Sequence, residues 1–461
     1  MANSYDVIVI GGGPTGENAA ARAAAGGLRV ALVESELVGG ECSYWACMPS
    51  KALLRPGEAL AAARRVPGAA GAVTGGVDVA ATLSSRDAFV SHMDDAGQVA
   101  WLEGEDIALH RGIGRISGER TVAVDPTGGD GYELTAKRAV VLATGSVTAF
   151  PPVSGLDPEQ VWDNRKATGA EEVPGHLLVL GGGTVGVEMA QAFRSLGAEV
   201  TIVEGGERLL AREEPFVGEE LALALSTAGV NVRTGVQAES VSRTDPGGAF
   251  TIHLDTGEAV ASDRILVATG RRPRTLDLGL ESVNLDPRDL VVDSQLRVVG
   301  AETWLYAVGD VNGRAPLTHM GKYQARLAAD HILGLQVDAW ADQRAVTRVV
   351  FTDPQVAAVG LTEAQAVEKG LPVRTVSYGV GDVAGGALTG EGVEGTAQMV
   401  VDTDRRVLLG ATFTGPGVSE MLHAATIAVA GEVPLDTLWH AVPAFPTMSE
   451  VWLRLMETYG L

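Results

Sequence analysis

The two cysteines of the chain lie close together, at positions 42 and 47. A chain that bends into the first turn of a helix brings positions i and i+5 within the roughly 5–6 Å between Cα atoms that a disulfide needs. Pro49 suits a helix start, and the alanine-rich stretch 52–64 continues that helix. Cys47 is therefore expected near a helix N-terminus with Lys51 one turn further on, and both features lower a thiol pKa. The spacing alone also fits two buried, inert cysteines, so the surrounding motifs must decide.

A glycine-rich turn precedes the cysteines. An apolar run at 5–10 leads into it, and an alanine-rich helix at 17–25 and a strand at 29–33, ending in Glu34, follow it. The turn consists of Gly11, Gly13, Pro14, Thr15 and Gly16, with the glycines in a G-x-G-x-x-G pattern. Backbone N–H groups and the helix dipole at such a turn bind a pyrophosphate, while the acid binds ribose hydroxyls. Strand, helix, strand and acid together predict a dinucleotide-binding unit.

The same pattern recurs in the middle of the chain. A strand at 176–180, a helix to about 196 and a strand at 199–203, ending in Glu204, surround a second glycine-rich turn. This turn consists of Gly181, Gly183, Thr184, Val185 and Gly186. Glu204 favours the free 2′-hydroxyl of NAD(H), because a 2′-phosphate would want arginine there. Arg208 and Arg212 lie nearby, so NADPH is disfavoured rather than excluded.

Composition bounds the class of protein. The 461 residues carry a formal net charge of −23, and 46% of them are hydrophobic. This length predicts two to four domains, and the acidic balance argues against nucleic acid and anionic membranes as partners. No run of about 18 apolar residues predicts a membrane span, and the N-terminus lacks the pattern of a secretory signal. Two cysteines without a wider cysteine framework fit a reducing cytoplasm.

The segment 39–51, GGECSYWACMPSK, resembles the active-site motif of the class I pyridine nucleotide-disulfide oxidoreductases. That family includes dihydrolipoamide dehydrogenase, glutathione reductase and mercuric reductase, and the resemblance extends along nearly the whole chain. It implies an α/β fold with two doubly wound, Rossmann-like domains and a C-terminal α+β dimerisation domain. We expect a split FAD domain at 1–152 and 274–343, an inserted NAD(P) domain at 153–273 and the interface domain at 344–461. The resemblance also implies a homodimer whose active site is formed by both subunits.

The resemblance assigns roles to individual residues. NADH would reduce FAD, and FAD would reduce the Cys42–Cys47 disulfide. Cys47, nearer the flavin, would form the charge-transfer thiolate, and Cys42 would attack the substrate. Lys51 and Glu188 match a family pair beside flavin N5, and Asp310 matches an aspartate on the ribityl hydroxyls. Further cofactor contacts are expected at Gly40, Glu41, Gly114, Ala143, Thr144, Gly145, Gly309, Leu317, Thr318 and His319, and in the second unit at Gly270. Between these motifs, residues 65–105 carry no recognisable chemistry, with helix expected around 85–102.

One motif departs from the family. Its C-terminal pattern usually reads His-Pro-Thr-x-x-Glu, in which the histidine of one subunit serves as acid and base for the other. Here Phe445 stands at the histidine position while Glu450 is kept. His440, five residues upstream, is more simply a surface or loop residue. The extra C-terminal cysteines of mercuric reductases and of high-molecular-weight thioredoxin reductases are missing, and no metal site is expected.

The sequence is therefore compatible with several electron acceptors. We expect a small-molecule disulfide, with a dithiol in the reverse direction. Electrons could instead pass from the flavin directly to a quinone or another acceptor, or between nicotinamide pools. Trp45 favours the last option, because soluble transhydrogenases resemble the chain there but lack the second cysteine. A third option is thiolate-nucleophile chemistry, as in the coenzyme M carboxylating relative, although that enzyme also departs at the glutamate. A redox sensor or carrier protein is the alternative outside the enzymes.

Overall fold

The computed structural model describes residues 3–243, 245 and 247–461. Contacts within the chain divide it into two compact units. Unit 1 comprises residues 1–49, 87–147 and 271–343, and unit 2 comprises residues 50–86, 148–270 and 344–461. Each unit is therefore built from three separate stretches of the sequence. Within the described ranges, no helix is long and apolar enough to cross a membrane.

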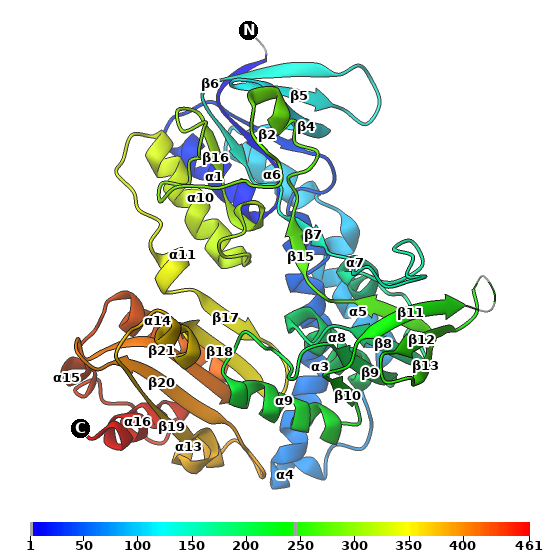
Figure 1. Ribbon diagram of the computed structural model, residues 1–461, viewed down its shortest axis with the longest axis vertical. Coiled ribbons are helices and arrows are strands. Elements are labelled where there is room, and N and C mark those ends of the chain that lie inside the picture. The colour runs from blue at the N-terminus through cyan, green and yellow to red at the C-terminus, as the bar shows by residue number, and fades with distance from the viewer. Residues whose placement is uncertain (1–2, 244, 246) are drawn as a thin grey trace. The chain divides into compact units, whose positions relative to one another are not determined.

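Unit 1 is built on a sheet of seven strands whose centre is parallel (Figure 1). Its parallel strands are β1 (Ser4–Ile10), β2 (Val30–Glu34), β3 (Ala108–Arg111), β6 (Tyr132–Leu142) and β16 (Leu305–Ala307), in the order β3-β2-β1-β6-β16. Val7, Ile8 and Val9 on β1 have no exposed surface, as expected for a strand covered on both faces. Helix α1 (Pro14–Ala25) connects β1 to β2 and packs against α10 (Thr318–Ile332).

Strand β6 joins two kinds of pairing, because its eleven residues are long enough for two partners. Its first half pairs antiparallel with β5 (Thr121–Asp125), which pairs in turn with β4 (Ile113–Gly118). Its second half pairs parallel with β16. The ends of β1, β6 and β16 thus lie side by side at one edge of the sheet, where the first glycine turn also lies.

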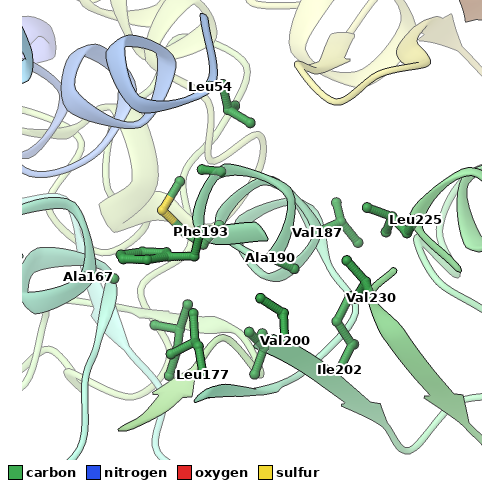
Figure 2. Close-up of a cluster of buried hydrophobic side chains, with 14 of the residues drawn as sticks. Leu54, Ala167, Leu177, Val187, Ala190, Phe193, Val200, Ile202, Leu225 and Val230 are labelled. Atoms are coloured by element: carbon green, nitrogen blue, oxygen red, sulfur yellow. The ribbon is translucent and has the colours of Figure 1, made fainter. Parts of the chain in front are cut away.

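Unit 2 contains the second nucleotide-type sheet. Its four parallel strands are β8 (His176–Leu180), β9 (Glu199–Glu204), β10 (Asn231–Thr234) and β14 (Arg264–Val267), in the order β10-β9-β8-β14. Helix α8 (Thr184–Ser195) crosses from β8 to β9. Figure 2 shows Phe193 of α8 in the core above Leu177 and Val200 of the strands. Leu54 of α3 belongs to the same buried cluster, which ties α3 to this sheet.

Two antiparallel sheets complete unit 2. The smaller comprises β11 (Ala238–Arg243), β12 (Phe250–Leu254) and β13 (Ala259–Ser262). The larger, in the order β17-β18-β21-β20-β19, comprises β17 (Thr347–Val350), β18 (Gln355–Gly360), β19 (Val373–Gly379), β20 (Thr396–Asp402) and β21 (Val407–Gly415). Helices α14 (Val418–Ala430) and α16 (Val451–Tyr459) pack on it. The expected α/β architecture with a C-terminal α+β part is confirmed.

Some local expectations need correction. The stretch expected as helix around 85–102 is interrupted: α5 (Val79–Phe89) and α6 (Ala96–Gly104) are separated by a short 3₁₀ turn, Ser91–Met93. All three residues of that turn have positive φ. Helix α3 (Cys47–Arg65) begins at Cys47 rather than at Pro49 and continues through Pro56. Helix α12 (Glu363–Glu368) begins with a reciprocal capping box between Thr362 and Gln365. Other helical elements include α2 (Gly40–Tyr44), α7 (Asn164–Thr168), α9 (Pro215–Thr227) and α15 (Leu435–Leu438).

Candidate active site

The cysteine pair lies across a break between two helices. Cys42 lies in the short helix α2 (Gly40–Tyr44), and Cys47 is the first residue of α3. Gly39 and Gly40 enter this bend with φ of 108° and 53°, which only glycine adopts readily. A Cβ on Gly40 would lie 2.7 Å from the Cα of Gly13, so the bend packs directly against the first glycine turn. This arrangement holds the segment that carries both thiols against the first glycine turn of unit 1.

The side chains of Cys42 and Cys47 form a hydrogen bond with each other. The hydrogen bond with Cys47 and burial raise the pKa of Cys42, whereas the hydroxyl of Thr318 and the charge of Lys322 lower it. The Oγ1 atom of Thr318 lies 3.4 Å from Cys47 Sγ. A raised pKa at Cys42 is the direction expected when Cys47 ionises first, since a second negative charge beside the first is unfavourable.

Lys51 forms an ion pair in unit 2. Its Nζ lies 2.7 Å from Oε2 of Glu188, whose side chain is 3% exposed. The other oxygen, Oε1, accepts a hydrogen bond of 2.9 Å from the backbone N–H of Phe351. The ring of Phe351 also lies 4.8 Å from Lys51 Nζ. The buried carboxylate is thus paired on both oxygens, which fixes the Lys51 ammonium one helical turn after Cys47 on α3.

The first glycine turn has the shape that a bound dinucleotide requires. A Cβ on Gly11 would collide with the carbonyl oxygen of Ala143, and one on Gly16 would collide with that of Gly11. Gly13 differs, because a Cβ added there would lie 3.9 Å from its nearest neighbour, the Cα of Gly40. Gly13 caps α1 without any side-chain hydrogen bond, so no side chain of the N-cap residue competes with a pyrophosphate for the first N–H groups of the helix. The residues therefore fit FAD.

Glu34, at the end of β2, accepts hydrogen bonds from the backbone of its own unit. Its Oε2 accepts a bond of 2.6 Å from Gly12 N–H, and its Oε1 one of 2.7 Å from Glu36 N–H. These bonds hold the carboxylate against the glycine turn. An oriented carboxylate beside the turn is the donor set expected for ribose hydroxyls.

The second glycine turn repeats these features. A Cβ on Gly181 or Gly186 would collide with a backbone carbonyl, whereas nothing lies within 4 Å of a Cβ on Gly183, which caps α8 without a side-chain bond. Glu204 accepts a bond of 2.5 Å from Gly182 N–H and one of 2.6 Å from Gly206 N–H. Thr184 and Val185 open α8, and Gly270 follows β14. These residues fit a nicotinamide dinucleotide by the same criteria.

The C-terminal segment places Phe445 and Glu450 in unit 2. The Phe445 side chain is 76% exposed in the single chain, and Glu450 is 7% exposed. Oε1 of Glu450 lies 2.7 Å from Arg454 Nη2, while its buried Oε2 has no hydrogen-bond partner among the described residues. His440 is exposed and follows α15. In the part of the chain that the structure describes, no group of three or more His, Cys, Asp or Glu side chains is arranged to hold a metal ion.

Comparison with known proteins identifies the family. Residues 5–325 match the family described as pyridine nucleotide-disulphide oxidoreductase, and residues 346–456 match its dimerisation domain. The chain belongs to this family. It is 35% identical to a dihydrolipoyl dehydrogenase of Thermus scotoductus, covering 98% of this chain and 97% of that one. It is 32% identical to a mercuric reductase of Staphylococcus aureus, covering 97% and 81%.

Solved structures of the family agree with the fold. LpdA from Mycobacterium tuberculosis superposes with a TM-score of 0.86 at 25% identity, covering 99% of this chain and 100% of that one. The HOCl-induced flavoprotein disulfide reductase RclA from Escherichia coli, as its Cu(II) complex, superposes with a TM-score of 0.85 at 26% identity, covering 99% of both chains. Family membership makes the chain an FAD-dependent oxidoreductase that uses a pyridine nucleotide, and the predicted family is confirmed.

Among the remaining predicted contacts of this pyridine nucleotide-disulphide oxidoreductase, Asp310 belongs to a network in unit 1. Ser146 Oγ donates to Asp310 Oδ2 at 2.6 Å and accepts from Arg271 Nε at 2.8 Å. Arg271 also reaches Glu41 at 3.5 Å. Ser146 and Arg271 were missed by sequence reasoning. Each of them directly follows an A-T-G sequence: Ser146 follows 143–145, and Arg271 follows 268–270. This shared position could have indicated both residues.

The other predicted positions fall into two groups. Ala143, Thr144 and Gly145 follow β6, and Gly309 follows β16, so both loops lie at the edge that holds the glycine turn; Leu317, Thr318 and His319 begin α10. Gly114 is different. A Cβ there would lie 3.0 Å from Val33 Cγ1 and 3.1 Å from Ile10 Cγ2, so close packing between strands accounts for this glycine without a cofactor.

Proposed function

We propose that the enzyme transfers electrons from NADH, by way of FAD, to a Cys42–Cys47 disulfide and from there to a small disulfide substrate. When bound, FAD supplies the chemistry that converts a two-electron hydride donor into a reductant for sulfur. The observation that carries the proposal is the pair of thiols at the start of α3, with Cys47 3.4 Å from the Thr318 hydroxyl. The net reaction is NADH, a proton and a disulfide giving NAD⁺ and two thiols.

The sulfur steps are two successive thiol–disulfide exchanges. The Cys42 thiolate attacks one sulfur of the substrate, forming a mixed disulfide and releasing the first thiolate. Cys47 then attacks Cys42, which releases the second thiol and restores the internal disulfide. Each step makes one S–S bond and breaks one. The raised pKa of Cys42 and the lack of a base at Phe445 make the first attack the demanding step.

The choice of NADH rests on Glu204. Its carboxylate is held in place by Gly182 N–H and Gly206 N–H, where a 2′-phosphate would meet a negative charge. The dimerisation domain supports a homodimer with active sites formed by both subunits, and exposed apolar side chains at Ile427, Val442 and Phe445 in that domain suit a subunit contact. A reducing cytoplasm stays the predicted location.

The test is an anaerobic NADH titration of the flavin-loaded protein followed by absorbance. A long-wavelength band at two electrons per subunit, lost in C47S, would mean that the thiols take up the electrons and that Cys47 ionises beside the flavin. Bleaching of the flavin at two electrons without that band would show that the cysteines are bypassed and would refute the proposed route.

The second candidate is direct reduction of a quinone or similar acceptor by the flavin. Phe445 favours it, because a site without the histidine base is poorly equipped to protonate a leaving thiolate. The double variant C42S/C47S separates the two functions. It should keep full quinone reductase activity if this candidate holds, and it should lose all disulfide reductase activity in either case.

A further inference from the structure

The short turn that carries Asp310 is held by a buried glutamine of α10. This 3₁₀ turn, Gly309–Asn312, follows β16. Oε1 of Gln324 accepts a hydrogen bond of 2.8 Å from Gly309 N–H and one of 2.9 Å from Asn312 Nδ2. Gln324 has no exposed surface. Its amide oxygen therefore binds the residue before Asp310 and the residue two positions after it.

A buried carboxylate fixes the orientation of the Gln324 amide. The Asp342 side chain has no exposed surface, and its Oδ1 lies 2.7 Å from Arg314 Nη2. Its Oδ2 accepts a hydrogen bond of 2.8 Å from Gln324 Nε2. A carboxylate paired with a guanidinium accepts hydrogen bonds and donates none. The NH₂ group of Gln324 must therefore face Asp342, which leaves its oxygen for Gly309 and Asn312.

Close packing places this turn beside the first glycine turn. Gly309 has a φ of 78°, and a Cβ there would lie 3.0 Å from Thr15 Oγ1. A Cβ on Gly321 of α10 would collide with the same hydroxyl. The Asp310 side chain is half-buried, and its Oδ2 accepts a hydrogen bond of 2.6 Å from Ser146 Oγ. The carboxylate of Asp310 is thus carried by a turn that is fixed against α1 and α10.

We propose that Gln324, oriented by Asp342, positions Asp310 for the ribityl chain of FAD. This inference goes beyond the proposed electron route and rests on the predicted contact of Asp310 with the ribityl hydroxyls. Gln324 has no exposed surface for a ligand, so it is a positioning residue that acts through Asp310. The strength of a hydrogen bond to a hydroxyl depends on distance and angle, and a turn that shifts would weaken the bonds that Asp310 makes.

The experiment separates the two halves of FAD. The flavin-loaded full chain is diluted in steps, and released FAD is measured by its fluorescence, which gives the dissociation constant for FAD. ADP carries the pyrophosphate and a ribose but no ribityl chain. It is measured as a competitor of FAD, so ADP bound at the second glycine turn is not counted. Q324L should raise the FAD dissociation constant about tenfold, the size of one lost hydrogen bond, and should leave the ADP inhibition constant unchanged.

Two further comparisons test the route through Asp310. D310A should raise the FAD dissociation constant and leave the ADP inhibition constant unchanged. Q324L should add little in the D310A background, because two changes to one contact are not additive. A328G is the matched control for stability, since Ala328 is a buried residue of α10 outside the hydrogen bonds described above. It should lower the free energy of unfolding in urea and leave both constants unchanged.

A parallel rise of both constants in Q324L would show a general loss of structure and would overturn the proposal. An unchanged FAD constant, or a full tenfold effect of Q324L in the D310A background, would overturn it as well. If Q324L does not fold, N312A decides: a loss of affinity for FAD alone supports the proposal, and a parallel or absent change overturns it. These measurements involve neither NADH nor a disulfide, so their outcome and that of the proposed electron route are independent.

Discussion

Replacing Phe445 by histidine should increase disulfide reductase activity, because the partner of such a histidine is still present. Glu450 is 7% exposed, one of its oxygens is bound to Arg454 at 2.7 Å, and the other is buried with no hydrogen-bond partner among the residues that the structure describes. A buried polar atom without a partner costs about 1–3 kcal/mol, and a hydrogen bond to a charged group contributes about 1.5–3 kcal/mol. The structure therefore keeps a carboxylate oxygen that gains from a new donor.

The magnitude follows from that bond. A hydrogen bond to the carboxylate that is stronger for the imidazolium by about 2 kcal/mol would raise the histidine pKa by roughly 1.5 units from about 6.5. A base with a pKa near 8 suits proton exchange with a thiol. General acid–base catalysis contributes about 10²–10⁴-fold, and we expect the lower end, about 10²-fold, because the side chain at position 445 is exposed in the single chain and an imidazole there is not held in place by close packing.

The assay is anaerobic reduction of oxidised lipoamide by NADH, with kcat/KM measured for the wild type, F445H, F445A and F445H/E450Q. F445A opens the same space without a base and controls for access. F445H should exceed both F445A and the double variant. Equal gains in F445H and F445A would refute the reasoning, because they would show that the phenylalanine limits access rather than proton transfer.

Three further changes test other parts of the site. K51M removes the ammonium that pairs with the buried Glu188 carboxylate and should lower the free energy of unfolding by about 2 kcal/mol, as measured by urea unfolding. The double variant K51M/E188Q should lose less unfolding free energy, because it leaves no buried charge. Equal losses in the two variants would show that the two residues are not coupled. The pKa of Glu17 is raised from 4.5 to about 7, so the folded state loses stability as pH rises through that range and the buried carboxyl group ionises. E17Q should therefore have a larger free energy of unfolding than the wild type at pH 8 but not at pH 4. An equal increase at both pH values would contradict this. E204A should lower kcat/KM for NADH about tenfold without lowering that for NADPH; a parallel loss would mean that Glu204 does not discriminate.

The sequence predicted best those parts of the site in which the requirement is local. Gly11 and Gly181 must be glycine because neighbouring carbonyl groups leave no room for a Cβ, and the turn, helix and acid that follow are close in the chain. The pairing of Lys51 with Glu188 spans 137 residues, so the resemblance to a family, and not the spacing, predicted it. The structure adds that the bond is buried and that both oxygens of Glu188 are used.

The parts that were missed have weak sequence signals for physical reasons. Phe351 binds Glu188 through its backbone N–H, and any residue except proline could do so. The break between α5 and α6 contains His92 with a φ of 51°, with no glycine or proline there to indicate it.

The pH dependence of wild-type turnover should differ between disulfide and ferricyanide as acceptors. Reduction of a disulfide needs an ionised Cys42 and a proton donor, whereas oxidation of NADH does not. The residues for nucleotide binding are bonded and oriented, as at Glu188 and Glu204. The sulfur half has Cys42 with a raised pKa and phenylalanine in place of a base. Below the pKa of Cys42 the thiolate fraction rises about tenfold per pH unit. Disulfide reduction should therefore rise with pH with a slope near one in log rate, while NADH oxidation by ferricyanide stays nearly flat. A bell-shaped pH profile of disulfide reduction, centred near pH 7, would mean that another side chain acts as the base and that Phe445 does not leave the site without one.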